Sequence, residues 1–191
     1  MSDPVVTNKV RFSYVSVFQP REALGGGEPK YSITVLIPKT DTQTMQRINA
    51  AIQKAISDNL ATTFGGVQPP SANMPVHDGD GLRQDGTPYG TECKGHWVIN
   101  ASTKMKPEVV DANGQHIMDQ SEVYSGCYGR VSLRFYTYNK AGRKGVGCGL
   151  GNVQKLADGE PLGGKTTAAE DFGTPIDQTE TSPDMKALLG L

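Results

Sequence analysis

Apolar and polar residues alternate along the first part of the chain. Over residues 5–18 this alternation has a period of two, which predicts a long, half-buried strand. The residues on one side of that strand are Val10, Phe12, Tyr14 and Phe18. Residues 31–37 show the same pattern, and Pro38 follows them. We therefore expect a second strand that ends at this proline, which cannot donate a ladder hydrogen bond.

The period then changes to that of a helix. Over residues 41–62 apolar side chains recur at steps of three and four, at Met45, Ile48, Ile52, Ile56 and Leu60. This spacing predicts an amphipathic helix. Thr40 and Gln43 have the spacing of a capping box at its start, and Gly65 with Gly66 marks its end.

The remaining pattern predicts a long loop and three more strands. Residues 64–92 are rich in glycine and proline, and a loop of that length is usually functional or disordered. Residues 95–104 predict a third strand, with Trp97, Ile99 and Ala101 on one face. Residues 128–139 and 144–154 both alternate and predict a β-hairpin with a basic tip.

These elements predict a mainly β fold. A small domain of about five strands closes into a barrel or forms a sandwich. One principal helix inserted after the second strand favours the five-stranded oligonucleotide/oligosaccharide-binding (OB) barrel, which we expect over residues 1–164. From residue 165 onward the periodicity vanishes and Thr, Glu, Asp and Pro dominate. Residues 165–191 are therefore predicted to be an acidic, flexible tail.

Charge is distributed unevenly along the 191 residues, although the net charge is only −1. Residues 1–165 carry 18 basic and 15 acidic side chains, whereas residues 166–191 carry one basic and five acidic side chains. A basic body with an acidic tail is compatible with nucleic-acid binding. The three cysteines form no Cys-x-x-Cys pair and the N-terminus resembles no secretion signal, so we expect a reduced cytosolic protein with no membrane segment.

The strand at residues 130–138 carries the main candidate binding row. Val131, Leu133 and Phe135 face one way and belong in a core. The opposite face carries Arg130, Ser132, Arg134, Tyr136 and Tyr138, spaced by about 6–7 Å. Such a row matches an extended nucleic-acid strand, since aromatic rings stack on bases and guanidinium groups pair with phosphates. Arginine and tyrosine are also ordinary residues on the solvent face of a strand.

The predicted contacts fall into three groups. The stacking candidates are Tyr124, Tyr128, Tyr136 and Tyr138. The main phosphate candidates are Arg130, Arg134, Lys140, Arg143 and Lys144. The secondary phosphate candidates are Lys9, Arg11, Lys104 and Lys106.

The second strand of the hairpin has an unusual composition. Between residues 145 and 151 the apolar positions Val146, Cys148 and Leu150 alternate with glycine. A face made only of glycine lets a backbone or a flat base approach closely. A sharply coiled barrel strand explains the same pattern.

The loop at residues 77–85 supports an alternative function. His77, Asp78, Asp80 and Asp85 could hold Mg²⁺ or Ca²⁺, which would make the protein a metal-dependent phosphodiester hydrolase. Aspartate and glycine are also ordinary turn residues. A third possibility is a β-rich virion structural or assembly module.

Four segments resemble a bacteriophage and prophage family of single-stranded-DNA-binding proteins. They are residues 9–14, 30–39, 124–131 (Tyr-Ser-Gly-Cys-Tyr-Gly-Arg-Val) and 147–155. The resemblance implies a non-catalytic OB-fold protein, without a cofactor, that coats single strands in phage replication and recombination. In distant podovirus relatives an acidic tail contacts replisome proteins, so we expect the tail to bind replication or recombination proteins. The sequence leaves a homodimer open.

Overall fold

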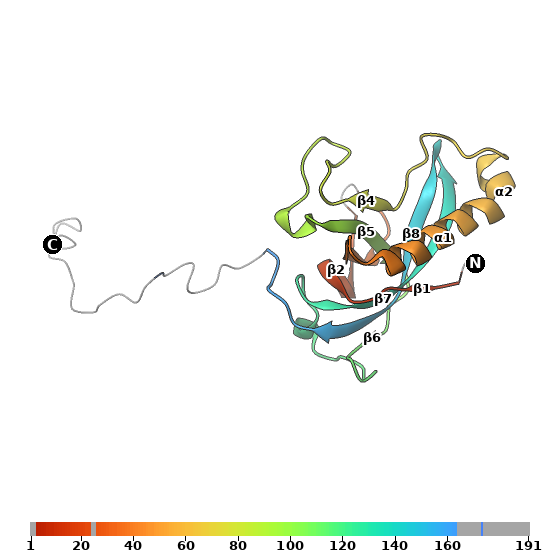
Figure 1. Cartoon of the computed structure of the whole chain (residues 1–191). Coiled ribbons are helices and arrows are strands. Elements are labelled where there is room, and N and C mark those ends of the chain that lie inside the picture. Colours follow the sequence, from red (N-terminus) through yellow and green to blue (C-terminus); the bar gives the residue numbers. More distant parts are fainter. Residues whose placement is uncertain (1–2, 24–25, 164–172, 174–191) are drawn as a thin grey trace, which may run out of the picture.

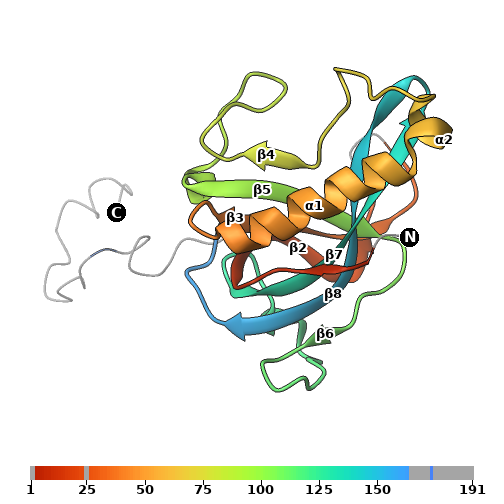
Figure 2. The same ribbon diagram turned by 45° about the vertical axis from the view of Figure 1, so that its right-hand side comes forward.

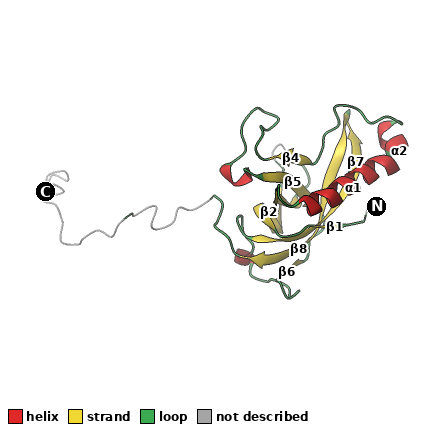
Figure 3. Ribbon diagram, in the orientation of Figure 1, coloured by secondary structure: helices red, strands yellow, loops and turns green. Residues whose placement is uncertain are grey.

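The computed structural model describes residues 3–23, 26–163 and 173 (Figure 1). Within them the chain is mainly β, with two helices and two short 3₁₀ turns (Figure 3). The elements are β1 (Val5–Val6), β2 (Val10–Arg21), β3 (Lys30–Pro38), α1 (Thr42–Asp58), α2 (Leu60–Phe64), β4 (Val76–Asp78), η1 (Thr91–Cys93), β5 (His96–Thr103), β6 (Val109–Val110), η2 (Gln120–Glu122), β7 (Tyr128–Lys140) and β8 (Arg143–Ala157). The predicted tail, residues 165–191, lies outside the described residues except for Gly173.

Five strands close into a ring. β2 pairs with β3, β3 with β5, β7 with β8, and β7 with β2, all antiparallel. The ring closes through a parallel pairing of β5 with β8, in which Ser102 lies opposite Gly149. This connectivity confirms the predicted five-stranded OB-like barrel. The short strands β1, β4 and β6 add to its margins.

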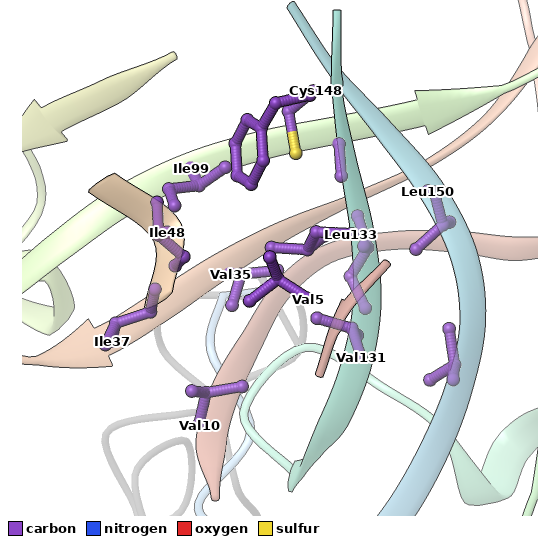
Figure 4. Packing of buried hydrophobic residues seen from close by; sticks show 14 of the residues in the cluster. Val5, Val10, Val35, Ile37, Ile48, Ile99, Val131, Leu133, Cys148 and Leu150 are labelled. Carbon is purple, nitrogen blue, oxygen red and sulfur yellow. The ribbon is translucent and has the colours of Figure 1, made fainter. Parts of the chain in front are cut away.

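The core fills the ring and the space under α1. Inward residues of β7 (Val131, Leu133) meet those of β3 and β5 (Val35, Ile99), and Ile48 of α1 packs against them (Figure 4). Figure 2 shows α1 running diagonally across the strands. Each of these side chains is essentially fully buried, so hydrophobic burial holds the helix on the barrel.

The predicted helix is present, but two details of its ends differ. Asp41, not Thr40, caps α1, because its Oδ1 accepts a hydrogen bond from the Thr44 amide at 3.1 Å. The helical segment also does not run unbroken to residue 62: it stops at Asp58, and α2 continues after Asn59. The Asn59 side chain donates to the Ala55 carbonyl at 2.9 Å, an alternative to continued helix.

The first predicted strand differs from the expectation at Tyr14. The segment splits into β1 and β2, and β2 carries an irregularity between Ser13 and Ser16 where its pairing with β3 shifts register. Val10 and Phe12 point into the core as predicted, but Tyr14 has a φ of 46° and is 66% exposed. The extra residue turns the tyrosine outward and restores inward packing at Val17.

The hairpin of β7 and β8 agrees with the sequence. Val131, Leu133 and Phe135 are buried, and Lys140 pairs with Arg143 across a two-residue turn. Both turn residues, Ala141 and Gly142, have positive φ, as a tight hairpin turn with right-handed strand twist requires.

The three cysteines are buried free thiols. Burial raises the pKa of Cys148 to about 12, so this thiol stays protonated and packs as an apolar side chain. Over residues 3–23 and 26–163, the helices are too short or too polar to traverse a lipid bilayer.

Candidate nucleic-acid interface

The predicted row on β7 lies on the outer face of the barrel. Arg130, Arg134 and Tyr136 are exposed, and Ser132 and Tyr138 are partly exposed. The Tyr136 side chain is 49% exposed, while burial of its remaining part raises the pKa of its phenol. The ring is therefore neutral at physiological pH and presents a face to solvent.

The rings of Tyr136 and Tyr138 lie against the glycines of β8, so this glycine face is covered by side chains of β7. Tyr136 lies opposite Gly147 and Tyr138 opposite Gly145. A methyl group added to Gly147 would collide with the Tyr136 ring, and one added to Gly145 would lie 2.9 Å from the Tyr138 hydroxyl. The missing side chains thus let the rings of β7 lie close to the β8 backbone. This geometry explains the glycine pattern by packing within the sheet.

A groove of about 630 Å³ runs beside Tyr136. Thr103, the last residue of β5, and residues 105–107 after it form one wall, and the outer face of β7 and β8 forms the other. Its lining includes Met105, Lys106, Arg134, Tyr136 and Gly149. Met105 is 80% exposed. The groove thus brings a thioether and an aromatic ring together with two cationic side chains. A nucleic-acid base with its phosphates has the matching chemistry.

Lys104 is directed elsewhere than Lys106. Its Nζ lies 2.6 Å from Glu28 Oε2, and both side chains are exposed. The hydrogen bond from Lys104 holds the pKa of Glu28 below its usual range.

The basic tip of the hairpin is held in place by neighbouring segments. Asn139 donates to the carbonyl of Thr63 in α2 at 3.3 Å, and the hydroxyls of Thr63 and Thr137 are 2.9 Å apart. The backbone amide of Asn73 donates to the backbone carbonyl of Lys144 at 3.0 Å. Lys140 and Arg143 are exposed and Lys144 is partly exposed on this anchored tip. The cations therefore extend from a supported hairpin.

Other predicted residues gather at the opposite end of β7. The Tyr128 ring lies under two cations, with Lys9 Nζ at 5.2 Å and the Arg11 guanidinium at 5.6 Å from its centroid. Arg11 donates to the carbonyls of Gly126 at 3.2 Å and Glu160 at 2.7 Å. These contacts fasten residues 126 and 160 to β2.

Tyr124 and Arg130 are likewise engaged within the chain. The Tyr124 hydroxyl accepts from the Gly159 amide at 3.1 Å and lies 3.0 Å from the Gly159 carbonyl. Arg130 Nε and Nη2 both donate to Gln154 Oε1, at 3.0 and 2.7 Å. The structure thus divides the predicted residues into a group at the groove and hairpin tip and a group at the far end of β7.

The loop at residues 77–85 is organised around a lysine. Lys39 Nζ lies 2.6 Å from both Asp78 and Asp80 and 4.8 Å above the Trp97 ring. Asp85 accepts from Thr87 in its own turn. In the described part of the chain, no three His, Cys, Asp or Glu side chains gather around a position for a metal ion. The geometry does not support the hydrolase alternative, because the carboxylates have structural partners.

Comparison with known proteins places the chain in a family. The model of the family described as "Enterobacter phage Enc34, ssDNA-binding protein" matches residues 3–185. The chain belongs to the Enc34 ssDNA-binding family. The resemblance seen in the sequence is thereby confirmed.

Proteins similar to this Enc34-family chain are found by sequence and by structure. "Putative protein p50" of Acyrthosiphon pisum secondary endosymbiont phage 1 is 31% identical over 172 residues, covering 86% of this chain and 90% of that protein. The single-stranded DNA-binding protein from bacteriophage Enc34, solved in complex with ssDNA, is 28% identical with a TM-score of 0.72, covering 83% and 88% of the two chains. The gp2.5 protein of bacteriophage T7 shares the fold, with a TM-score of 0.62 at 14% identity over 86% and 97% of the chains.

Several residues of the candidate interface in this Enc34-family chain were missed by sequence reasoning. Met105 forms a wall of the groove, and its position between Lys104 and Lys106 was the available signal. The outer face of β3 and β5 is lined by small polar residues, with Thr34 opposite Asn100 and Ser32 opposite Ser102. The Thr34 hydroxyl donates to Asn100 Oδ1 at 2.7 Å. Nothing in the sequence pattern set these residues apart.

Proposed function

We propose that the protein binds single-stranded DNA without catalysis and with little sequence preference. The observation that carries this proposal is the groove beside Tyr136, which Met105, Lys106 and Arg134 also line. Membership of the Enc34 family and the likeness to a relative solved with ssDNA support it.

The chemistry of the groove suits any base. A tyrosine ring and a thioether contact the face of a base, which all four bases possess, and stacking contributes about 1–3 kcal/mol per base. Backbone at Gly149 lets a flat group lie against β8. Binding through base faces leaves the hydrogen-bonding edges unread, so sequence preference stays low.

Cationic side chains supply the contacts to phosphate. Lys106 and Arg134 border the groove, and Lys140, Arg143 and Lys144 extend from the hairpin tip. Each phosphate that they neutralise releases counterions, which makes binding weaken as salt rises. The protein would act on phage DNA in replication or recombination, in the host cytoplasm.

The acidic residues 165–191 complete the proposal. They lie outside the described residues, except for Gly173, and carry five of the acidic side chains. We propose that they compete with DNA for the cationic surface and offer a contact to replication or recombination proteins. A 1–164 variant should bind oligo-dT more tightly than the whole chain, and equal affinities would contradict competition.

The central test compares two pairs of variants by fluorescence titration with oligo-dT. Tyr136→Ala should weaken binding by roughly 5- to 150-fold, the equivalent of about 1–3 kcal/mol, whereas Tyr136→Phe should bind like the original chain. Met105→Ala should also weaken binding. Met118→Ala is its matched control, because Met118 is similarly exposed, at 88%, but lies outside the groove. Unchanged affinity of both alanine variants of the groove would overturn this site.

A further inference from the structure

Tyr14 is an aromatic residue that the backbone turns away from the core. The alternation along β2 would place it beside Val10 and Phe12, yet it is 66% exposed. Its φ of 46° lies in the left-handed region, which large side chains rarely adopt. β-bulges that re-aim a side chain are over-represented at sheet edges, at barrel rims and beside functional sites. This bulge leaves exposed a ring that a regular strand would bury.

A second hollow, of about 690 Å³, lies beside Tyr14. Its lining includes Arg11, Tyr14, Glu92, Glu160 and Leu162. The Arg11 guanidinium is already bound to two backbone carbonyls, and the two glutamates disfavour a phosphate inside the hollow. An uncharged, flat group that stacks on the tyrosine fits this chemistry better than an anion. A nucleic-acid base, with its phosphate left outside in solvent, is such a group.

The strand registers connect Tyr14 to the groove at Tyr136. The bulge lies between the β2 residues that pair with Thr34 and Ser32 of β3. Ser32 pairs with Ser102 of β5, Ser102 with Gly149 of β8, and Gly149 with Arg134 of β7. Across four strand spacings this path measures about 19 Å.

The side chains along this path are small. Its surface is formed by Ser32, Ser102 and Gly149, with Thr34 and Asn100 beside them. A polar surface without large side chains allows a nucleic-acid strand to cross the barrel. The path from β2 to β7 is short enough to be spanned by the roughly 4–16 nucleotides that one OB fold covers.

We propose that Tyr14 is a second base-stacking residue, and that single-stranded DNA crosses the outer face of the barrel from Tyr136 to Tyr14. This inference rests on the proposed function. It adds a stacking site on β2, at one margin of the face of β3 and β5 on which OB folds bind oligonucleotides.

The test uses substitutions that separate the ring from the backbone. Asparagine tolerates positive φ, so Tyr14→Asn removes the ring while keeping the bulge. On oligo-dT of twelve nucleotides, Tyr14→Asn should bind at least fivefold more weakly, with an unchanged or higher melting temperature. Tyr14→Phe should keep the original affinity. Met118→Asn, also at an exposed apolar side chain, should leave affinity unchanged.

A second measurement locates the contact directly. Photo-cross-linking with oligonucleotides that carry 5-iododeoxyuridine should label Tyr14 within the tryptic peptide of residues 12–21. If Tyr14→Asn binds within twofold of the original chain and the peptide stays unlabelled while Tyr136→Ala is weakened, the inference is wrong and the proposed function stands. If the original chain ignores oligo-dT at low salt, both are wrong.

Discussion

At the scale of single residues, the glycines of β8 determine how closely the rings of β7 approach the sheet. Gly147→Ala would place a methyl group against the Tyr136 ring and force it to tilt. We expect weaker oligo-dT binding, measurable by fluorescence titration, with little loss of fold. In a Tyr136→Ala background the same substitution should have no further effect, because the double-mutant cycle isolates the contact between the two residues. Additive losses would show that Gly147 acts on something other than the ring.

A second prediction at this scale concerns Lys39. Its hydrogen bonds hold the pKa values of Asp78 and Asp80 below their usual range. Carboxylates with a lowered folded-state pKa stabilise the fold above the ordinary aspartate pKa, and this contribution is lost as pH falls through the lowered value. In Lys39→Met, NMR titration should show both pKa values rising toward normal. The variant should also lose less stability on acidification than the original chain; unchanged pKa values would contradict the pairing.

At the scale of elements, we expect the β7–β8 hairpin to make two separable contributions to DNA binding: the cations of its tip and the ring of Tyr136. Replacing Lys140, Arg143 and Lys144 by glutamine should reduce the slope of log K against log salt by about 0.7 for each phosphate that the tip no longer neutralises. Tyr136→Ala should lower affinity and leave that slope nearly unchanged. Lys54→Gln on α1 is the control, since Lys54 pairs with Asp58 on the helix surface. A salt slope unaffected by the hairpin substitutions would remove the tip from the interface.

The elements also show what sequence patterning can predict. The hairpin was predictable because Val131 to Phe135 alternate without interruption and the turn contains Gly142, which adopts positive φ without strain. The bulge at Tyr14 was missed, although the apolar positions change there from the even series of Val10 and Phe12 to the odd series of Val15 and Val17. Phe18 hid this change because it continues the even series. The groove was hidden for a different reason: residues 103–107 and Tyr136 are far apart in sequence and meet only through the ring closure.

At the scale of the whole molecule, the described chain presents cations and rings at the groove without a gathered set of metal ligands. Labelled oligo-dT should therefore bind in EDTA at least as tightly as in Mg²⁺ or Mn²⁺, because these cations compete only for the phosphates. The oligonucleotide should remain intact on a denaturing gel under all three conditions. Cleavage products that require the divalent ion would restore the hydrolase alternative.

The ring of strands has a consequence for crowding. Its five long strands pair in a closed ring, in which β2 meets β7 at two residue pairs and β5 meets β8 at one. The marginal strands β1, β4 and β6 are only two or three residues long. Long unpaired margins are what allow β proteins to fuse edge to edge and aggregate. Ring closure and short marginal strands would therefore allow many copies to bind side by side on one nucleic-acid strand, at high local concentration, without pairing through their sheet edges.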